Sequence, residues 1–272
     1  SHVVRSFARG RTCSNRQSSS YLSNAIRGIF AMVPKLLVIN LGPTDYMKTY
    51  NLQEHLRKKR REGKISDALI LVEHPHVYTI GRAGGWDFLL APIDYLQSRS
   101  IPVIEVDRGG SITYHGPGQL VGYPILDLRI HGFDLHNLLR RYELSLQKAL
   151  EHFGLYAKSL PGLTGVWVGD AKIAAIGVGV RERVTYHGFA LNVDPDLTYF
   201  DLIIPCGIKD KKVTSMAQEL GCPVKLEEVI PVVAKSFAEV FNLKPEFVHN
   251  PHEVIPFEIN ISSYLDKSSV AS

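Results

Sequence analysis

Residues 108–119 form the segment whose composition most directly suggests chemistry. It reads Arg-Gly-Gly-Ser-Ile-Thr-Tyr-His-Gly-Pro-Gly-Gln, so four glycines and a proline lie among an arginine, a histidine and a glutamine. Glycine lets backbone approach a ligand closely and reaches φ values closed to other residues. Because strand-like runs precede and follow this polar loop, it predicts a small-molecule pocket. The alternative interpretation is a long hairpin turn, since Gly-rich loops are common.

A second candidate for chemistry is Cys206, one of only three cysteines in the chain. So few cysteines indicate no disulfide framework and a reducing compartment. Pro205 and Gly207 flank Cys206 directly after the apolar run 202–204. This predicts a thiol in a tight turn at the end of a strand. A lone cysteine is more often a small buried hydrophobe than a nucleophile, so both interpretations stay open on the residues alone.

Three segments add to the Gly-rich loop. Residues 164–177 read TGVWVGDAKIAAIG, residues 187–192 read HGFALN, and residues 205–208 read PCGI. In this order and spacing, the four segments resemble the octanoyltransferases of lipoate biosynthesis, also called lipoyl(octanoyl) transferases. The resemblance runs from about residue 35 to about residue 242, and the block at 108–119 is its most specific part.

The resemblance implies two catalytic residues, Cys206 as nucleophile and Lys172 as its partner. A nearby cation favours the thiolate and lowers the pKa of a cysteine from its ordinary value of about 8.5. The two residues are 34 positions apart, so only tertiary structure can join them. The resemblance also implies an acyl or pantetheine pocket, lined by Arg108, Gly109, Gly110, Ser111, Ile112, Thr113, Tyr114, His115, Ala175, Ile176, Gly177, Gly188, Phe189 and Ala190. His115 and His187 are candidates for a base or a pocket residue, and otherwise for structural histidines.

The activity that the resemblance implies is the first step of endogenous protein lipoylation. Octanoyl would pass from octanoyl-acyl carrier protein to Cys206, and then to a specific lysine of a lipoyl domain. Such domains belong to 2-oxoacid dehydrogenase E2 subunits and the glycine cleavage H protein. Lys172 would accept a proton from the incoming amine. We expect no ATP, cofactor, metal, nucleic acid or membrane to take part, and a monomeric enzyme.

Three other functions compete with this one. An ATP-dependent lipoate or biotin protein ligase would share the fold. Such an enzyme needs a nucleotide-binding loop, and residues 81–85 resemble one only weakly. A cysteine hydrolase would pair Cys206 with His115 or His187 and release free octanoate. A non-catalytic module that binds carrier proteins is the third, and the presence of both Lys172 and Cys206 argues against it.

The positive charge of the chain lies at its N-terminus. Residues 1–32 hold five arginines, no lysine and no acid, and without them the net charge of +4 becomes −1. A near-neutral body argues against a large nucleic-acid footprint. The Arg- and Ser-rich start is typical of a mitochondrial transit peptide, or else it is a leader. We therefore expect a disordered basic arm at 1–32, a catalytic domain at 33–243 and a C-terminal tail at 244–272. The expected location is cytoplasmic, or the mitochondrial matrix if the arm is a transit peptide.

Hydrophobic periodicity predicts the elements that position these residues. Helices are expected at 45–61 with Thr44 as N-cap, at 133–153 after Asp134, and at 226–241. Strands are expected at 35–40, 68–73 and 184–193, with a hairpin at 166–180 that turns at Gly169. Strands joined mainly by hairpins favour an α+β fold, a mixed β-sheet flanked by helices. The resemblance implies the catalytic-domain fold of biotin and lipoate protein ligases.

The predicted helix at 45–61 ends in the basic run 57–61. Cations there suit the negative end of the helix dipole. The favoured interpretation is a solvated helix end, and the alternative is a docking patch for an acidic carrier protein.

Overall fold

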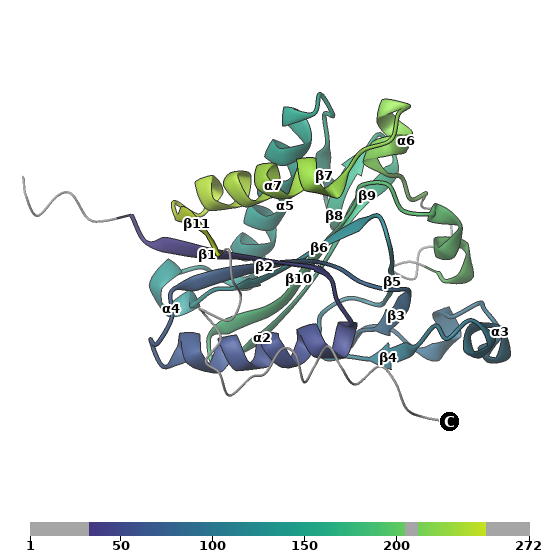
Figure 1. Cartoon of the computed structure of the whole chain (residues 1–272), viewed down its shortest axis with the longest axis horizontal. Coiled ribbons are helices and arrows are strands. Elements are labelled where there is room, and N and C mark those ends of the chain that lie inside the picture. The colour runs from purple at the N-terminus through teal and green to yellow at the C-terminus, as the bar shows by residue number, and fades with distance from the viewer. Residues whose placement is uncertain (1–32, 205–211, 249–272) are drawn as a thin grey trace, which may run out of the picture. The chain divides into compact units, whose positions relative to one another are not determined.

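The computed structural model describes residues 33–204 and 212–248 (Figure 1). Its large sheet has eight strands, in the spatial order β11 (Lys244–Val248), β1 (Lys35–Pro43), β2 (Asp67–Glu73), β6 (Gln119–Ile125), β10 (Val184–Asn192), β9 (Ala171–Arg181), β8 (Leu163–Val168) and β7 (Lys158–Leu160). A second sheet has the order β4 (Val103–Glu105), β3 (Val77–Ile80) and β5 (Ile112–His115). In the large sheet β1 pairs in parallel with β11 and β2, and the other pairs are antiparallel.

Helices cover both faces of the large sheet. The helices are α2 (Tyr46–Arg61), α3 (Ile93–Ser98), α4 (Leu128–His131), α5 (Leu135–His152), α6 (Met216–Leu220) and α7 (Leu226–Val240), with 3-10 turns at Trp86–Phe88 and Leu197–Leu202. Figure 1 shows α5 and α7 side by side on one face and α2 along the opposite face. Every residue of β10 is buried, because this central strand has helices on both sides. The predicted fold class, a mixed sheet flanked by helices, is confirmed.

The helix α5 shows how the sequence positions these layers. Its buried side chains Leu138, Tyr142, Leu146 and Leu150 follow one another at four-residue steps and face the sheet. The Asp134 side chain accepts from the backbone N–H of residue 137 at the start of the helix, as an N-cap does. The hairpin of β8 and β9 likewise turns at Gly169, as predicted, with a left-handed φ of 60°.

The expected N-cap of α2, Thr44, is wrong, because the N-cap is Asp45, whose carboxylate accepts from Lys48 N at 3.1 Å. Residues 244–248, the first five of the expected C-terminal tail, form the strand β11, which pairs in parallel with β1 at the edge of the sheet. Residues 249–272, the rest of that tail, and the expected basic arm at 1–32 lie outside the described residues.

The basic end of α2 is more buried than a solvated helix end would be. Arg57 and Arg60 are both buried. Arg57 donates to Glu182, between β9 and β10, at 3.2 Å, and Arg60 donates to Asp67 at the start of β2 at 2.7 Å. Buried charges persist when they are paired, so these two arginines fasten α2 to its surroundings. The expected solvated end is wrong for these two residues.

Candidate active site

Two other segments of the chain, residues 81–83 and the strand β9, form backbone hydrogen bonds with the loop at 108–111. The backbone N–H groups of residues 81–83 donate to carbonyl groups of the loop at 3.0–3.1 Å. From the other side, the loop's Gly109 N donates to Val178 O of β9 at 3.0 Å. The loop is therefore held by main-chain hydrogen bonds next to the centre of the large sheet.

Glycines make this close approach sterically possible. A Cβ atom on Gly177 of β9 would lie 2.7 Å from Gly109 O, and one on Gly81 would lie 2.4 Å from Gly110 O. Both distances are shorter than a carbon–oxygen contact allows, so any side chain would push the loop away. Gly110 also has a φ of 83°, which other residues rarely adopt.

The Arg108 side chain anchors the same loop to the second sheet. Its Nη2 donates to Thr79 O and to Thr79 Oγ1, both at 2.8 Å, and its Nη1 donates to Gly109 O at 3.0 Å. The guanidinium is buried and lies at the wall of the pocket. Hydrogen bonds to a charged donor are stronger than neutral ones, so Arg108 orders the loop as well as lining the site.

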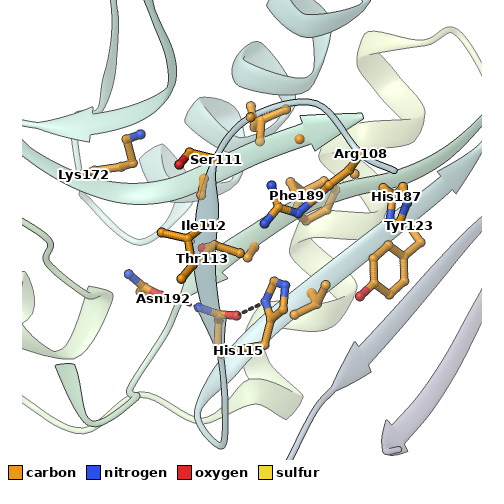
Figure 2. A pocket seen from close by; sticks show the side chains of 18 of the residues that line it. Arg108, Ser111, Ile112, Thr113, His115, Tyr123, Lys172, His187, Phe189 and Asn192 are labelled. Atoms are coloured by element: carbon orange, nitrogen blue, oxygen red, sulfur yellow. Dashed lines mark hydrogen bonds between the residues drawn. The ribbon is translucent and has the colours of Figure 1, made fainter. Parts of the chain in front are cut away.

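A pocket opens between this loop and the middle of β9 and β10 (Figure 2). The space between its walls, counted together with the mouth that opens to solvent, is about 780 Å³. The residues that line it are Tyr46, Arg108, Gly110, Ser111, Ile112, Thr113, His115, Gln119, Val121, Tyr123, Lys172, Ala175, Ile176, Gly177, His187, Gly188, Phe189, Ala190, Asn192, Phe200 and Val213.

Twelve of the fourteen residues expected in the pocket lie in its wall, and Gly109 and Tyr114 do not. Gly109 turns its N–H to β9, as described above. Tyr114 points into the core of the second sheet, where its hydroxyl lies 2.7 Å from His76 Nδ1 and its ring stacks on Tyr199. Its neighbours Thr113 and His115 line the pocket, because successive side chains of a strand point to opposite faces.

His187 is held in an unusual backbone conformation. It lies within β10 with a φ of 56°, and its N–H donates to Gln53 Oε1 at 2.8 Å. Its Nε2 lies 3.0 Å from Asp107 Oδ1. Burial lowers the pKa of His187 to about 4 despite this carboxylate. Backbone strain of this kind persists only where surrounding contacts over-determine it, and it is common at functional sites.

Asp107 stays ionised beside this neutral ring. Burial alone would raise its pKa, but hydrogen bonds from Tyr186 and His187 outweigh burial and lower the pKa to about 2. A carboxylate can only accept, so His187 carries its proton on Nε2. The Nδ1 atom is then an acceptor in a buried position, and no residue of the described part of the chain donates to it.

His115 lies further along the same pocket. Its Nδ1 is 2.7 Å from Gln119 Oε1, and Gln119 Nε2 donates to Asn192 Oδ1 at 2.9 Å, as the dashed lines of Figure 2 show. Burial, together with the neighbouring ring of His74, lowers the pKa of His115 to about 3. Both histidines of the pocket are therefore neutral at pH 7.

Lys172 lies near the start of β9, and its buried side chain lines the pocket. Its Nζ lies 4.8 Å from the centre of the Trp167 ring, a cation–π distance. Its backbone N donates to Lys212 O at 2.8 Å, and its backbone O accepts from Thr214 N at 3.0 Å. The segment that resumes at residue 212 is thus bonded directly to Lys172.

Cys206 falls between residues 204 and 212, outside the described residues. The described chain on both sides reaches the pocket, because Phe200 and Val213 are part of its wall. Ile204, two positions before Cys206, donates its N–H to Phe88 O at 2.8 Å.

Several residues of the pocket wall lie outside the predicted set. Tyr46 comes from the first turn of α2, and Tyr123 and Asn192 come from central strands. Their sequence signals are those of ordinary core positions. Asn192 was the one with a usable signal, because a buried polar residue at the end of an apolar strand needs hydrogen-bond partners.

Comparisons with known proteins define the class. A family model described as "Lipoyl protein ligase A/B catalytic domain" matches residues 45–238. A solved structure described as a lipoate protein ligase from T. acidophilum with bound lipoic acid superposes with a TM-score of 0.64 at 18% identity, covering 85% of this chain and 96% of that chain. At this identity the likeness shows the fold.

Two curated relatives are much closer in sequence. An octanoyltransferase of Solibacter usitatus is 48% identical over 75% of this chain and 92% of its own length. An octanoyltransferase of Koribacter versatilis is 45% identical over 80% of this chain and 89% of its own length. The chain therefore belongs to the octanoyltransferases of the lipoyl protein ligase A/B family, and it acts in octanoyl transfer for protein lipoylation. Within residues 33–204 and 212–248, no helix has the length and apolarity needed to span a bilayer.

Proposed function

We propose that this enzyme moves octanoyl from octanoyl-acyl carrier protein to a lysine of a lipoyl domain through a thioester on Cys206. The observation that carries the proposal is the place of Lys172. It lies in the wall of the pocket and is hydrogen-bonded through its backbone to residues 212 and 214, which follow Cys206 closely in the chain. A cation held there would favour the thiolate form of a nearby cysteine.

The proposed reaction balances in two steps. In the resting pair Cys206 is a thiolate and Lys172 an ammonium. The thiolate attacks the thioester carbon, the donor's carbon–sulfur bond breaks, and the departing sulfur takes a proton from Lys172. The acceptor amine then attacks the Cys206 thioester and gives one proton to Lys172. Cys206 leaves as a thiolate, so the resting pair is restored.

The wall formed by β9 and β10 suits the acyl chain. Gly188 pairs with Gly177 and Ala190 with Ala175, so small residues face each other across the two strands. Phe189 and Ile176, the pair between them, supply apolar surface. Each methylene of the acyl chain that is buried in such a slot contributes about 0.8 kcal/mol to the binding free energy. The length of the acyl chain therefore affects how tightly it binds.

The proposed acceptors are lipoyl domains of 2-oxoacid dehydrogenase E2 subunits and the glycine cleavage H protein. The acyl donor already carries an activated thioester, so we propose that no ATP is consumed, and that the enzyme works as a cytoplasmic monomer. The relatives' name, octanoyltransferase, and the lysine in the pocket support this assignment.

A transfer assay separates this function from a ligase. The full chain is mixed with an apo lipoyl domain and either octanoyl-acyl carrier protein without ATP, or free octanoate with ATP. Octanoylated lipoyl domain should form in the first mixture. Product only in the second would make the protein an ATP-dependent ligase, and free octanoate without product would make it a hydrolase.

A further inference from the structure

Two side-chain amides connect β6 to β10 at the wall of the pocket. Gln119 Nε2 donates to Asn192 Oδ1 at 2.9 Å and to Tyr114 O at 3.2 Å. Asn192 Nδ2 in turn donates to Thr214 O at 3.0 Å. At the other end of this series of hydrogen bonds, His115 Nδ1 lies 2.7 Å from Gln119 Oε1. Figure 2 labels His115 and Asn192, which lie on either side of Gln119 in these hydrogen bonds.

The direction of these hydrogen bonds is fixed at both backbone contacts. The carbonyl oxygens of Thr214 and Tyr114 can only accept, so Asn192 and Gln119 must each turn their NH₂ group toward them. The amide oxygen of Asn192 then accepts from Gln119. The oxygen of Gln119 is left facing His115, whose Nδ1 must therefore carry the hydrogen. Nε2 of His115 is left as the ring nitrogen with a free lone pair.

The groups around His115 favour an uncharged ring. His74 lies edge-on at 5.8 Å between ring centres, and Tyr46 from α2 stacks at 6.0 Å. Arg108 and His187 act on it electrostatically from the loop and from β10. Burial is the largest cause of the lowered pKa; His74, Arg108 and His187 act in the same direction, and the hydrogen bond with Gln119 acts against them. None of these neighbours is a carboxylate that would stabilise the charged form.

The same row of amides ends on the backbone that holds Lys172. Thr214, whose carbonyl accepts from Asn192, donates its own N–H to Lys172 O at 3.0 Å. Asn192 and Thr214 are both buried, so water does not compete for these bonds.

We infer that Gln119 and Asn192 are positioning residues for acyl transfer: they hold His115 in its Nδ1–H tautomer, with Nε2 as an acceptor in the pocket, and they fix the backbone bridge beside Lys172. The acyl chain and the thioester offer no hydrogen-bond donor. His115 Nε2 therefore accepts a hydrogen bond from an N–H group. That group is either the attacking amine of the lipoyl domain or an amide of the pantetheine group that carries octanoyl on the acyl carrier protein. The role of Lys172 in this inference rests on the proposed function. The inferred tautomer of His115 is independent of the proposed function.

NMR on the unaltered full chain tests the tautomer. With ¹⁵N-labelled histidine, the signals of His115 are those that disappear in a His115→Asn variant. They should show a protonated Nδ1 and an unprotonated Nε2 from about pH 5 to about pH 8. A protonated Nε2, or a charged ring at pH 7, would overturn the inference. This outcome does not depend on whether Cys206 carries octanoyl, so it fails or holds independently of the proposed function.

A Gln119→Glu variant tests the role in catalysis. A carboxylate beside Nδ1 favours the charged ring, which has no acceptor at Nε2, and a pKa change of one to three units is typical of such a pair. Because the pKa of His115 starts at about 3, such a change brings it to at most about 6, where up to about ten charged rings exist for each neutral one at pH 5. Turnover of this variant relative to the unaltered enzyme should therefore fall by up to about tenfold at pH 5 and recover as pH rises toward 7. The matched control is Gln147→Glu, because Gln147 donates to Ser159 Oγ at 2.8 Å outside the pocket wall. Melting temperatures show that both variants are folded.

Separate measurement of the two half-reactions identifies the N–H. A slower discharge of acyl-enzyme to the lipoyl domain in Gln119→Glu assigns it to the attacking amine. A slower acylation by octanoyl-acyl carrier protein assigns the N–H to the pantetheine group of the donor. Turnover that falls by the same factor at every pH would overturn the inference, because loss of structure alone has no pH dependence of this kind.

Discussion

Three imidazoles that are buried in the described part of the chain should make the stability of this protein strongly dependent on acid. Burial lowers the pKa of His74 and His187 to about 4 and that of His115 to about 3, from an ordinary value of 6.5. The folded state therefore resists protons that the unfolded chain takes up readily. The stabilisation is present above pH 6.5 and is lost as pH falls below it, toward the folded-state values.

The size of the loss follows from proton linkage. Between about pH 6.5 and pH 5 the unfolded chain binds up to three more protons than the folded one, and each is worth about 1.4 kcal/mol per pH unit. The loss is therefore about 2 kcal/mol for each histidine and at most about 6 kcal/mol for all three. This is comparable with the roughly 5–15 kcal/mol of a whole domain. Asp107, with a pKa of about 2, loses its proton far below this window and contributes nothing to it.

Urea denaturation at a series of pH values between 5 and 7 measures this dependence. The free energy of unfolding should fall steeply below pH 6.5, and a His74→Asn variant should lose about one third of that slope. His136→Gln is the control, because His136 is exposed and water surrounds it in the folded and unfolded chain alike. Equal unfolding free energies at pH 7 and pH 5, or equal slopes in the two variants, would refute the reasoning.

Other predictions concern the loop at the pocket. Gly177→Ala places a Cβ 2.7 Å from Gly109 O, so the loop should move and kcat/KM for octanoyl transfer should fall at least tenfold, whereas Gly85→Ala, with open space around its Cβ, should leave the rate unchanged. Arg108→Lys loses the paired bonds to Thr79 and should lower the free energy of unfolding by about 1–3 kcal/mol, measured by urea denaturation. Thr79→Val removes one of these bonds and should cost about half as much; an equal or larger loss would contradict this account of the anchor.

Local patterns of the sequence predicted those elements whose causes are local. The stripe of α5 and the Gly169 turn between β8 and β9 depend on residues within a few positions of each other. The Gly-rich composition of 108–119 correctly indicated a pocket for the same reason. Family motifs, and not periodicity, indicated the residues of β9 and β10 that line it.

Features that depend on distant partners could not be predicted in this way. The five residues of β11 form a strand because β1, about two hundred positions earlier, offers a free edge. Arg60 is buried because Asp67 meets it across a turn, and a basic helix end gives no sign of that. Asn192 and Gln119 read as strand termini, and only the fold shows that their amides meet.

The most direct test of the central claim is intact-mass analysis of the full chain after mixing with octanoyl-acyl carrier protein in the absence of acceptor. The account predicts one added octanoyl group, located on Cys206 by peptide mapping. It also predicts that Lys172→Met slows formation of this adduct by about 10²–10⁴-fold, the usual range for a lost proton-transfer group. No adduct on the unaltered enzyme, or an undiminished adduct in Cys206→Ser, would contradict the account.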